Sequence, residues 1–460
     1  DNGDGGRVIV WSNEYTNFAG SITAKGSDTG MGGFVETSSK DNLQVSGYVN
    51  AVGGDAAGTW LLDPRNITIT TTSSGGPDQA QLFSPVADDA TVKASTIVST
   101  LTSGNNVIIN TQSSSGSQDG NITVSSDIVS TTTTHDDLSI TFTAANDITI
   151  NADISTTKTL NVNLQAEGDI IIGDGSNNAS ITTKGGNFTV QGSNAQGNAV
   201  LAKGDEAGSF TLSAGSSINT TGEAGDAGGT ITIETASQNP DGGGATDADI
   251  IINGNLTTSG GTASSSVGLA GGAISLETND SGVITFGSGA DITTTGGAGN
   301  GSNNAGGAGG NVTLNTTNDA ITLNDTTITT SGGAGAGSGV QGAGGSITIS
   351  DPLTLATNTV TLTTGATAGA IDLSSTVDGS TGLSVTSGTG SLSLGGVLGG
   401  NTTLSSLSIT ANSLTISNNI TTNNGLIDIN APVTLGADVV ISSGTGTGNV
   451  EFSSTITGGQ

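Results

Sequence analysis

The sequence predicts an all-β fold, a parallel β-helix in which short strands stack coil upon coil. Two observations predict it. Short segments such as Ile148-Thr149-Ile150 and Ile347-Thr348-Ile349 alternate aliphatic residues with Thr or Ser, and Gly, Asn, Asp and Ser separate them. An aliphatic residue followed by small polar residues also recurs at intervals of 36 to 38 residues. These recurring positions are Ile181, Ile218, Leu256, Ile292 and Ile328.

The interval sets the expected coil length. A unit of this size with four or more short strands and no helical pattern fits two successive coils of about 18 residues each. A β-sandwich would need large inward-facing residues, and a β-propeller would need blade-sized units with aromatic or Asp-based signatures. Neither pattern is present, so the solenoid is the favoured architecture.

Three segments follow one another along the chain. Residues 1–75 hold six of the twelve aromatic residues and predict a β-helix start with a heavier core. Residues 76–104 interrupt the pattern with two prolines, and we interpret them as an insertion or buttress. The apolar spacing near 91–101 predicts a short helix there. Residues 105–460 are Gly/Ser/Thr/Asn-rich β-helical repeats.

The repeats contain two long glycine-rich stretches, at 296–310 and 332–345. Glycine lowers the tendency to form regular strands, and these stretches carry few side chains that could pack. We therefore expect them to bulge outward as loops without folding.

Composition excludes several classes of protein. The chain has 8 Lys and Arg against 39 Asp and Glu, a net charge of -31, which argues against nucleic-acid or membrane-surface binding. It has no Cys, so disulfides and thiolate sites are excluded, and no apolar run long enough to span a membrane. All eight basic residues precede residue 204, whereas 19 acidic residues follow it.

A resemblance to a known family rests on motifs at the beginning of the chain. These are Gly5-Gly6-Arg7-Val8-Ile9-Val10-Trp11, Phe18-Ala19-Gly20-Ser21-Ile22-Thr23-Ala24-Lys25-Gly26, Gly32-Gly33-Phe34-Val35-Glu36-Thr37-Ser38 and Gly58-Thr59-Trp60-Leu61-Leu62-Asp63-Pro64-Arg65-Asn66-Ile67. Their order and spacing resemble the stem region of filamentous haemagglutinin-like exoproteins of the two-partner secretion pathway. A later series resembles repeats in the distal stems of the same proteins: Gly369-Ala370-Ile371-Asp372-Leu373, Val377-Asp378-Gly379, Leu383-Ser384-Val385, Gly388-Thr389-Gly390 and Leu407-Ser408-Ile409-Thr410.

The resemblance implies a right-handed parallel β-helix exported by a Gram-negative bacterium to the cell surface or beyond. Its implied partners are an outer-membrane two-partner secretion transporter and a host, neighbouring-cell or matrix surface. The signal peptide and secretion domain typical of the family are not in this sequence. We therefore expect the chain to be a segment of a longer rod.

Candidate catalytic groups are few. His135 is the only imidazole, and the acidic pairs Asp88-Asp89, Asp136-Asp137 and Asp205-Glu206 resemble the carboxylates of β-helical polysaccharide-cleaving enzymes. A solvated loop position explains His135 without any function. Enzymes that hold anionic sugars also need cations, which residues 204–460 lack. We assign no catalytic, cofactor-binding or metal-binding residue.

Calcium is the one ligand left open. Asp1-Asn2-Gly3-Asp4 and Gly173-Asp174-Gly175-Ser176-Asn177-Asn178 offer oxygen ligands, although Asn and Asp also form turns. Gly242-Gly243-Gly244-Ala245-Thr246-Asp247 departs from the calcium nonapeptide at its fourth position. Threonine runs at 131–134 and 293–295 suggest an ice-binding face, but the better run recurs only every 36 residues or so.

The sequence thus favours a non-enzymatic shaft of a secreted, cell-surface adhesin or fibre. The first alternative is a subunit of a self-polymerising extracellular filament, because the end of a β-helix exposes strand edges that can pair with another copy. The second is a carbohydrate-active β-helix enzyme, which would require a cluster of carboxylates on one face.

Overall fold

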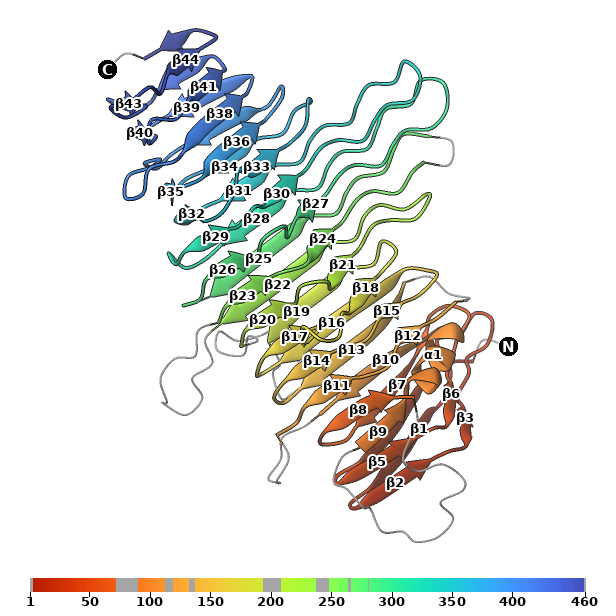
Figure 1. Cartoon of the computed structure of the whole chain (residues 1–460). Coiled ribbons are helices and arrows are strands. Elements are labelled where there is room, and N and C mark those ends of the chain that lie inside the picture. The colour runs from red at the N-terminus through yellow and green to blue at the C-terminus, as the bar shows by residue number, and fades with distance from the viewer. Residues whose placement is uncertain are drawn as a thin grey trace. The chain divides into compact units, whose positions relative to one another are not determined.

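The computed structural model describes residues 3–71, 90–111, 119–131, 137–192, 208–236, 248–263, 266–279 and 281–458. It confirms the parallel β-helix (Figure 1). The chain passes repeatedly through three long sheets of 16, 13 and 12 strands, called sheets 1, 2 and 3 here. Neighbouring strands in the described ranges pair in parallel, as in β13 with β16 and in β14 with β17.

The strands follow in spatial order. Sheet 1 contains β1 (Arg7–Ser12), β4 (Phe34–Ser39), β7 (Gly58–Asp63), β10 (Asn105–Asn110), β13 (Leu138–Ala144), β16 (Leu160–Ala166), β19 (Phe188–Gly192), β22 (Ile231–Ala236), β25 (Ile274–Asn279), β28 (Val312–Asn315), β31 (Ile347–Ile349), β34 (Ile371–Leu373), β37 (Ser391–Leu394), β39 (Ser413–Ile416), β42 (Val433–Leu435) and β45 (Ile456–Thr457). Sheet 2 contains β2 (Tyr15–Phe18), β5 (Asn42–Val45), β9 (Ala90–Lys93), β8 (Ile67–Thr70), β11 (Ile122–Val124), β14 (Ile148–Ile150), β17 (Ile170–Ile172), β20 (Phe210–Leu212), β23 (Ile250–Ile252), β26 (Ile284–Phe286), β29 (Ile321–Leu323), β32 (Leu353–Leu355) and β35 (Val377–Gly379). Sheet 3 contains β12 (Ile128–Val129), β15 (Ile154–Ser155), β18 (Ser180–Thr182), β21 (Ser217–Asn219), β24 (Asn255–Thr257), β27 (Ile292–Thr293), β30 (Thr327–Thr329), β33 (Val360–Thr363), β36 (Gly382–Thr386), β38 (Ser406–Thr410), β41 (Ile427–Asn430) and β44 (Val450–Phe452). Two further pairs are β3 (Ser21–Thr23) with β6 (Tyr48–Asn50) and β40 (Ile420–Thr421) with β43 (Ile441–Ser442).

The chain divides into two compact units. The first unit comprises Asp1–Ser216 and Ala236–Thr246, and the second comprises Ser217–Thr235 and Asp247–Gln460. From β10 to β36, the described coils of both units pass in turn through one strand of sheet 1, one of sheet 2 and one of sheet 3.

The core consists of aliphatic ladders that run from coil to coil. In sheet 3 of the second unit, Leu256, Ile292, Ile328 and Leu362 occupy one row, and each is fully buried. The residues between the buried positions along a strand face outward, which is the alternation the sequence predicts. Burial of a row of this kind stabilises by about 25 cal/mol for each Å² of apolar surface removed from water.

The predicted coil length is wrong. Ile292 in β27 pairs directly with Ile328 in β30, so the 36-residue interval is a single coil. In sheet 1 the described coils range from 19 residues, between Leu414 and Val433, to 47, between Trp60 and Val107. Each repeat contains three strands instead of four or more, because its glycine-rich part forms no strand.

The glycine-rich stretches are also more ordered than the sequence predicts. We call residues 220–229, 258–263, 266–272, 294–310 and 330–345 the glycine layer. Its loops lie side by side and extend away from the strands (Figure 1). The amide of Gly260 donates to the carbonyl of Thr295 in the next loop, at 2.8 Å, and Gly297 donates to Leu269 in the opposite arm of a neighbouring loop, at 2.7 Å.

Glycine makes this close packing feasible. A Cβ atom on Gly297 would lie 1.9 Å from the carbonyl oxygen of Gly261, which is far inside van der Waals contact. The loops therefore form a hydrogen-bonded double layer and not a set of independent bulges.

The first unit contains the predicted helix. Helix α1 (Ala94–Thr102) follows β9 and buries Ala94, Ile97 and Leu101. It contacts β6 and β12, the strands that precede and follow it on the third wall of the solenoid. Tyr48 Oη lies 2.7 Å from Ser103 Oγ just beyond the helix. The helix thus takes the place that a strand of sheet 3 takes in later coils, because the first strand of that sheet, β12, follows the helix.

The aromatic residues of the first unit divide between core and surface. Trp60 is fully buried, donates from Nε1 to Thr37 Oγ1 at 3.0 Å, and packs edge-on against Phe18. Trp11, by contrast, is 54% exposed on the edge strand β1. Pro77 and Pro85, which marked the predicted insertion, lie outside the described residues.

Candidate functional site

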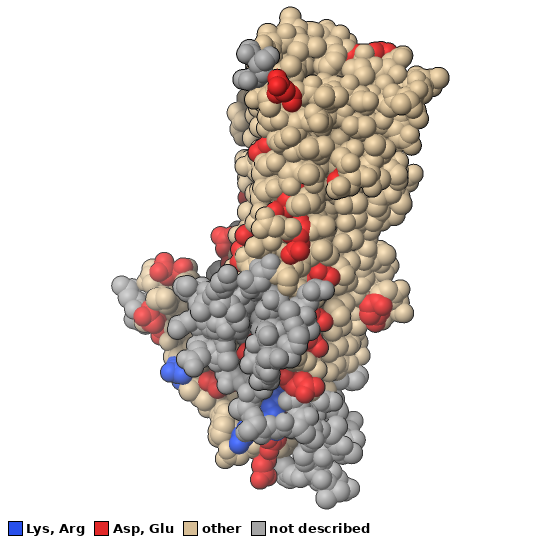
Figure 2. Space-filling view, turned by 90° about the vertical axis from the view of Figure 1, so that its left-hand side faces the viewer, with Lys and Arg blue, Asp and Glu red and all other residues tan. Residues whose placement is uncertain are grey.

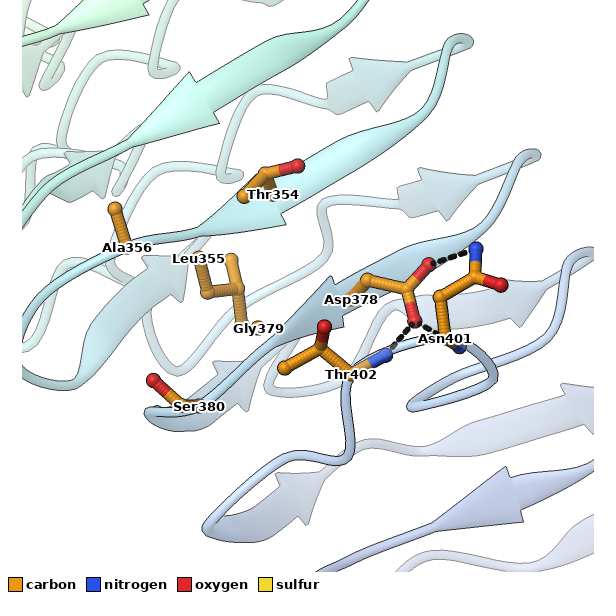
Figure 3. A pocket seen from close by; sticks show the side chains of 8 residues that line it. All are labelled: Thr354, Leu355, Ala356, Asp378, Gly379, Ser380, Asn401 and Thr402. Carbon is orange, nitrogen blue, oxygen red and sulfur yellow. Dashed lines mark hydrogen bonds between the residues drawn. The ribbon is translucent and has the colours of Figure 1, made fainter.

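A hollow of about 410 Å³ opens on the surface of the second unit, near the end of sheet 2 (Figure 3). It is lined by Thr354, Leu355, Ala356, Asp378, Gly379, Ser380, Asn401 and Thr402. These residues come from strands β32 and β35, from the residue that follows each strand and from the loop that follows Leu398. Its volume falls within the range of about 300 to 1,000 Å³ that is typical of small-molecule sites.

Two features distinguish the chain beside the hollow from the regular coil. Gly379 pairs with Leu355 and occupies an inward-facing position, but it contributes no side chain. Its φ of 145° and a neighbouring carbonyl, 2.1 Å from where a Cβ would be, both require glycine. In the next coil, Leu398 forms only isolated bridges, with Val377 and Ile420, in place of a strand.

Asp378 fixes the loop that borders the hollow. Its Oδ1 accepts the amides of Asn401, at 2.8 Å, and Thr402, at 3.1 Å, and its Oδ2 accepts the Asn401 side-chain amide at 3.3 Å. An ionised carboxylate has about four acceptor positions, so one position remains for a ligand. Figure 3 shows the Asp378 carboxylate between the two strands and this loop.

The rest of the lining is uncharged. The hydroxyl groups of Thr354, Ser380 and Thr402 are exposed, and none forms a side-chain hydrogen bond within the described ranges. The exposed methyl group of Ala356 is apolar, whereas the Leu355 side chain is buried in the core. No Lys or Arg follows residue 203, so no cation of this unit balances Asp378.

The excess of acidic over basic side chains extends to the wider surface. On the face in Figure 2, the few Lys and Arg side chains lie in the lower part, whereas acidic side chains are scattered over the surface above them. Several carboxylates have a structural role in binding the backbone of the next coil. Asp291 Oδ1, for example, accepts the amide of Thr327 at 2.8 Å.

Most of the residues considered for catalysis lie outside the described residues. These are His135, Asp136, the pair Asp88-Asp89 and the pair Asp205-Glu206. Asp137 is described and has a φ of 61°, a turn conformation that Asp tolerates.

The described calcium candidate is engaged in its own turn. Asp174 Oδ1 accepts the amides of Ser176 and Asn177 at 2.9 and 2.7 Å, and Oδ2 accepts Asn177 Nδ2 at 2.9 Å. The hydrogen bonds from Asn177, followed by the one from Ser176, lower the pKa of Asp174. Asp4 Oδ1 accepts the amide of Met31. Across the described ranges, no three His, Cys, Asp or Glu side chains group as metal ligands.

The remaining predicted features have structural positions. Residues 1, 2 and 242–247, and most of the threonine run 131–134, lie outside the described residues. In the other run, Thr294 is fully buried and donates to the carbonyl of Gly310 at 2.6 Å. This run therefore does not present three threonines to solvent.

A perturbed carboxyl group lies elsewhere, on the first unit. Burial, and then the nearby charge of Glu36, raise the pKa of Asp63 to about 6. Asp63 ends β7 and is opposite Ser38 of β4, so Glu36 is its diagonal neighbour on the outer face of sheet 1. Sequence reasoning missed this pair and the hollow, because both depend on strand register.

The chain matches no protein-family model. A search of the curated proteins likewise gives no significant match. No helix among the described segments is long and apolar enough to cross a membrane.

Proposed function

We propose that this chain is the structural, non-enzymatic shaft of a secreted, cell-surface adhesin or fibre, of the type resembled by its motifs. The observation that carries the proposal is the parallel pairing of sheet 1, in which one strand from each coil pairs with the strand of the next coil from β1 to β45. Backbone pairing, buried aliphatic rows and carboxylates that bind the next coil all act along the same direction. Repeats coupled in this way transmit load between neighbours and unfold cooperatively with them.

Transporter-dependent export tests this proposal. The chain is fused behind the secretion domain of a two-partner exoprotein and expressed in a Gram-negative host with and without the matching transporter. We expect protease-accessible chain on intact cells only when the transporter is present. Transporter-independent retention inside the cell would contradict the proposed localisation. Release of sugars from a polysaccharide panel would support the enzymatic alternative instead.

A specific observation favours a second function, a filament subunit. Val450 and Ile456 pair with the fully buried positions Ile427 and Val433, yet they are 38% and 49% exposed. Strands β44 and β45 therefore carry apolar side chains at inward-facing positions, and we infer that a further coil, such as the first coil of a second copy, can stack on them.

Sedimentation velocity at increasing concentration tests the filament. We expect concentration-dependent growth, blocked by Ile456→Glu, which places a charge on the stacking surface. Ser453→Glu is the matched control, because Ser453 is exposed and lies outside both strands. A chain that is monomeric at every concentration would contradict this second function.

A further inference from the structure

We propose that the hollow beside β35 binds an uncharged saccharide unit through the hydroxyls of Thr354, Ser380 and Thr402 and the carboxylate of Asp378. This inference is independent of whether the chain is a shaft or a filament subunit. It assigns a ligand class to a surface with no structural role that we can identify.

The charge of the hollow selects the class of ligand. Asp378 is the only ionisable residue that lines it, and this unit has no Lys or Arg to attract a phosphate, sulfate or carboxylate. Anionic glycans are therefore repelled. A purely apolar ligand would leave three hydroxyls and a carboxylate without water, which is unfavourable. An uncharged ligand rich in hydroxyl groups avoids both costs.

The hydrogen-bonding capacity of the hollow matches such a ligand. Each Thr or Ser hydroxyl can both donate and accept, so it can pair with a sugar hydroxyl in either direction. The remaining acceptor position of Asp378 can take a sugar O–H, giving a charge-assisted hydrogen bond. The exposed methyl group of Ala356 offers an apolar contact for the C–H face of a ring.

The site is held in place without its ligand. The Asp378 bonds to Asn401 and Thr402 fix the loop, and the amide of Gly379 donates to the carbonyl of Thr402 at 3.0 Å. The loop is thereby tied to β35 from both sides. Pre-organisation of this kind reduces the ordering cost of binding.

Saturation-transfer NMR and calorimetry on the full chain test the proposal. The probes are glucose, galactose, N-acetylglucosamine and their short uncharged oligomers, with a sialylated and a sulfated oligosaccharide as anionic comparators. We expect weak binding of at least one uncharged sugar and none of the anionic ones. Removal of the hydroxyls in Thr354→Ala/Ser380→Ala/Thr402→Val should weaken binding by about tenfold or more.

Thr322→Ala is the matched control. Thr322 pairs with Thr354 one coil earlier on the same row, but it does not line the hollow. We expect it to bind as the unaltered chain does. Absence of binding to every uncharged probe, preference for an anionic probe, or unchanged binding by the triple variant would each overturn the proposal. None of these outcomes bears on the export or sedimentation tests.

Discussion

Asp63 ends strand β7 with a carboxyl group that folding removes from water. Its pKa is raised to about 6 from an ordinary 3.8, first by burial and then by Glu36. Below about pH 4 the group is protonated in both the folded and the unfolded chain. Between the two pKa values only the unfolded chain readily ionises, so stability falls as pH rises through this window. The full cost, on the order of 2 to 3 kcal/mol, is present above about pH 6.

Asp63→Asn removes this cost. We expect the variant to raise the free energy of unfolding by about 2 to 3 kcal/mol at pH 7.5, with little effect at pH 3.5. Urea denaturation followed by circular dichroism across pH 3.5 to 7.5 measures the change. Asp55→Asn, at an exposed position of the same unit, is the control. An equal gain at both pH values would show that charge is not the cause.

A second residue-scale feature is a row of buried threonines in the glycine layer, each at the first residue of its loop. Thr258, Thr294 and Thr330 are fully buried, one in each successive coil. Each hydroxyl donates to a glycine carbonyl on the returning arm of its loop, at 2.5 to 2.7 Å. The row therefore closes the base of each loop with the same bond.

Thr294→Val tests one member of the row. Valine preserves the shape but leaves the Gly310 carbonyl without this donor, and we expect a loss of about 1 to 3 kcal/mol in the free energy of unfolding. Thr293→Val is the control, because Thr293 is an outward-facing, half-buried neighbour in β27. The urea midpoints of the two variants give the comparison. Equal midpoints would mean that the buried bond contributes nothing measurable.

At the scale of the element, the glycine layer depends on close approach of one arm to another. A side chain on Gly297 would overlap the Gly261 carbonyl, so Gly297→Ala must push two backbone segments apart. Overpacking of this kind typically costs 1 to 3 kcal/mol or more. We expect the cost to be local, with faster hydrogen exchange at the amides of Gly260 and Gly333 than at the strands.

Gly20→Ala provides the comparison for this prediction. A Cβ on Gly20 would meet nothing within 4 Å, so the substitution adds a methyl group without overlap. Protection of the glycine-layer amides should be unchanged in this variant. Retained protection in Gly297→Ala as well would show that the arms are not packed as described.

The glycine layer also explains which elements the sequence could predict. Alternation of apolar and polar residues identified strands such as β14 and β31, and apolar spacing identified helix α1. The predicted coil length was too short, because each glycine-rich stretch belongs to the same coil as the strands before it and not to a second coil. Their order comes from backbone hydrogen bonds between loops, and such bonds leave no hydrophobic period in the sequence.

The sequence could not predict the candidate site either, and the reason is related. Gly379 is one of 76 glycines, and the motif Val377-Asp378-Gly379 that contains it does not show that its position faces inward. Only the pairing with Leu355 shows that this glycine occupies an inward-facing position of the strand. Asp378 was similarly part of a motif, but its bonds to Asn401 and Thr402 join residues more than 20 positions apart.

At the scale of the whole molecule, the net charge of -31 sets the response to salt. Carboxylates without nearby cations repel one another in the folded chain, and this repulsion opposes folding. The Debye length falls from about 30 Å at 0.01 M to about 10 Å at 0.1 M ionic strength, so added salt screens most of the long-range repulsion. Hydrogen bonds from backbone amides to carboxylates act over a short distance, so salt screens them much less.

We therefore expect the urea midpoint to rise between 0.01 and 0.3 M NaCl. The triple variant Asp226→Asn/Asp438→Asn/Glu451→Gln removes exposed acids from the second unit, and its midpoint should rise less steeply. Repeating the series with KCl separates screening from ion-specific effects, because both salts screen equally. A midpoint that falls with salt would mean that attractive charge pairs outweigh repulsion, which the 39 acidic and 8 basic residues make unfavourable. An equal slope in the triple variant would place the repulsion at other carboxylates.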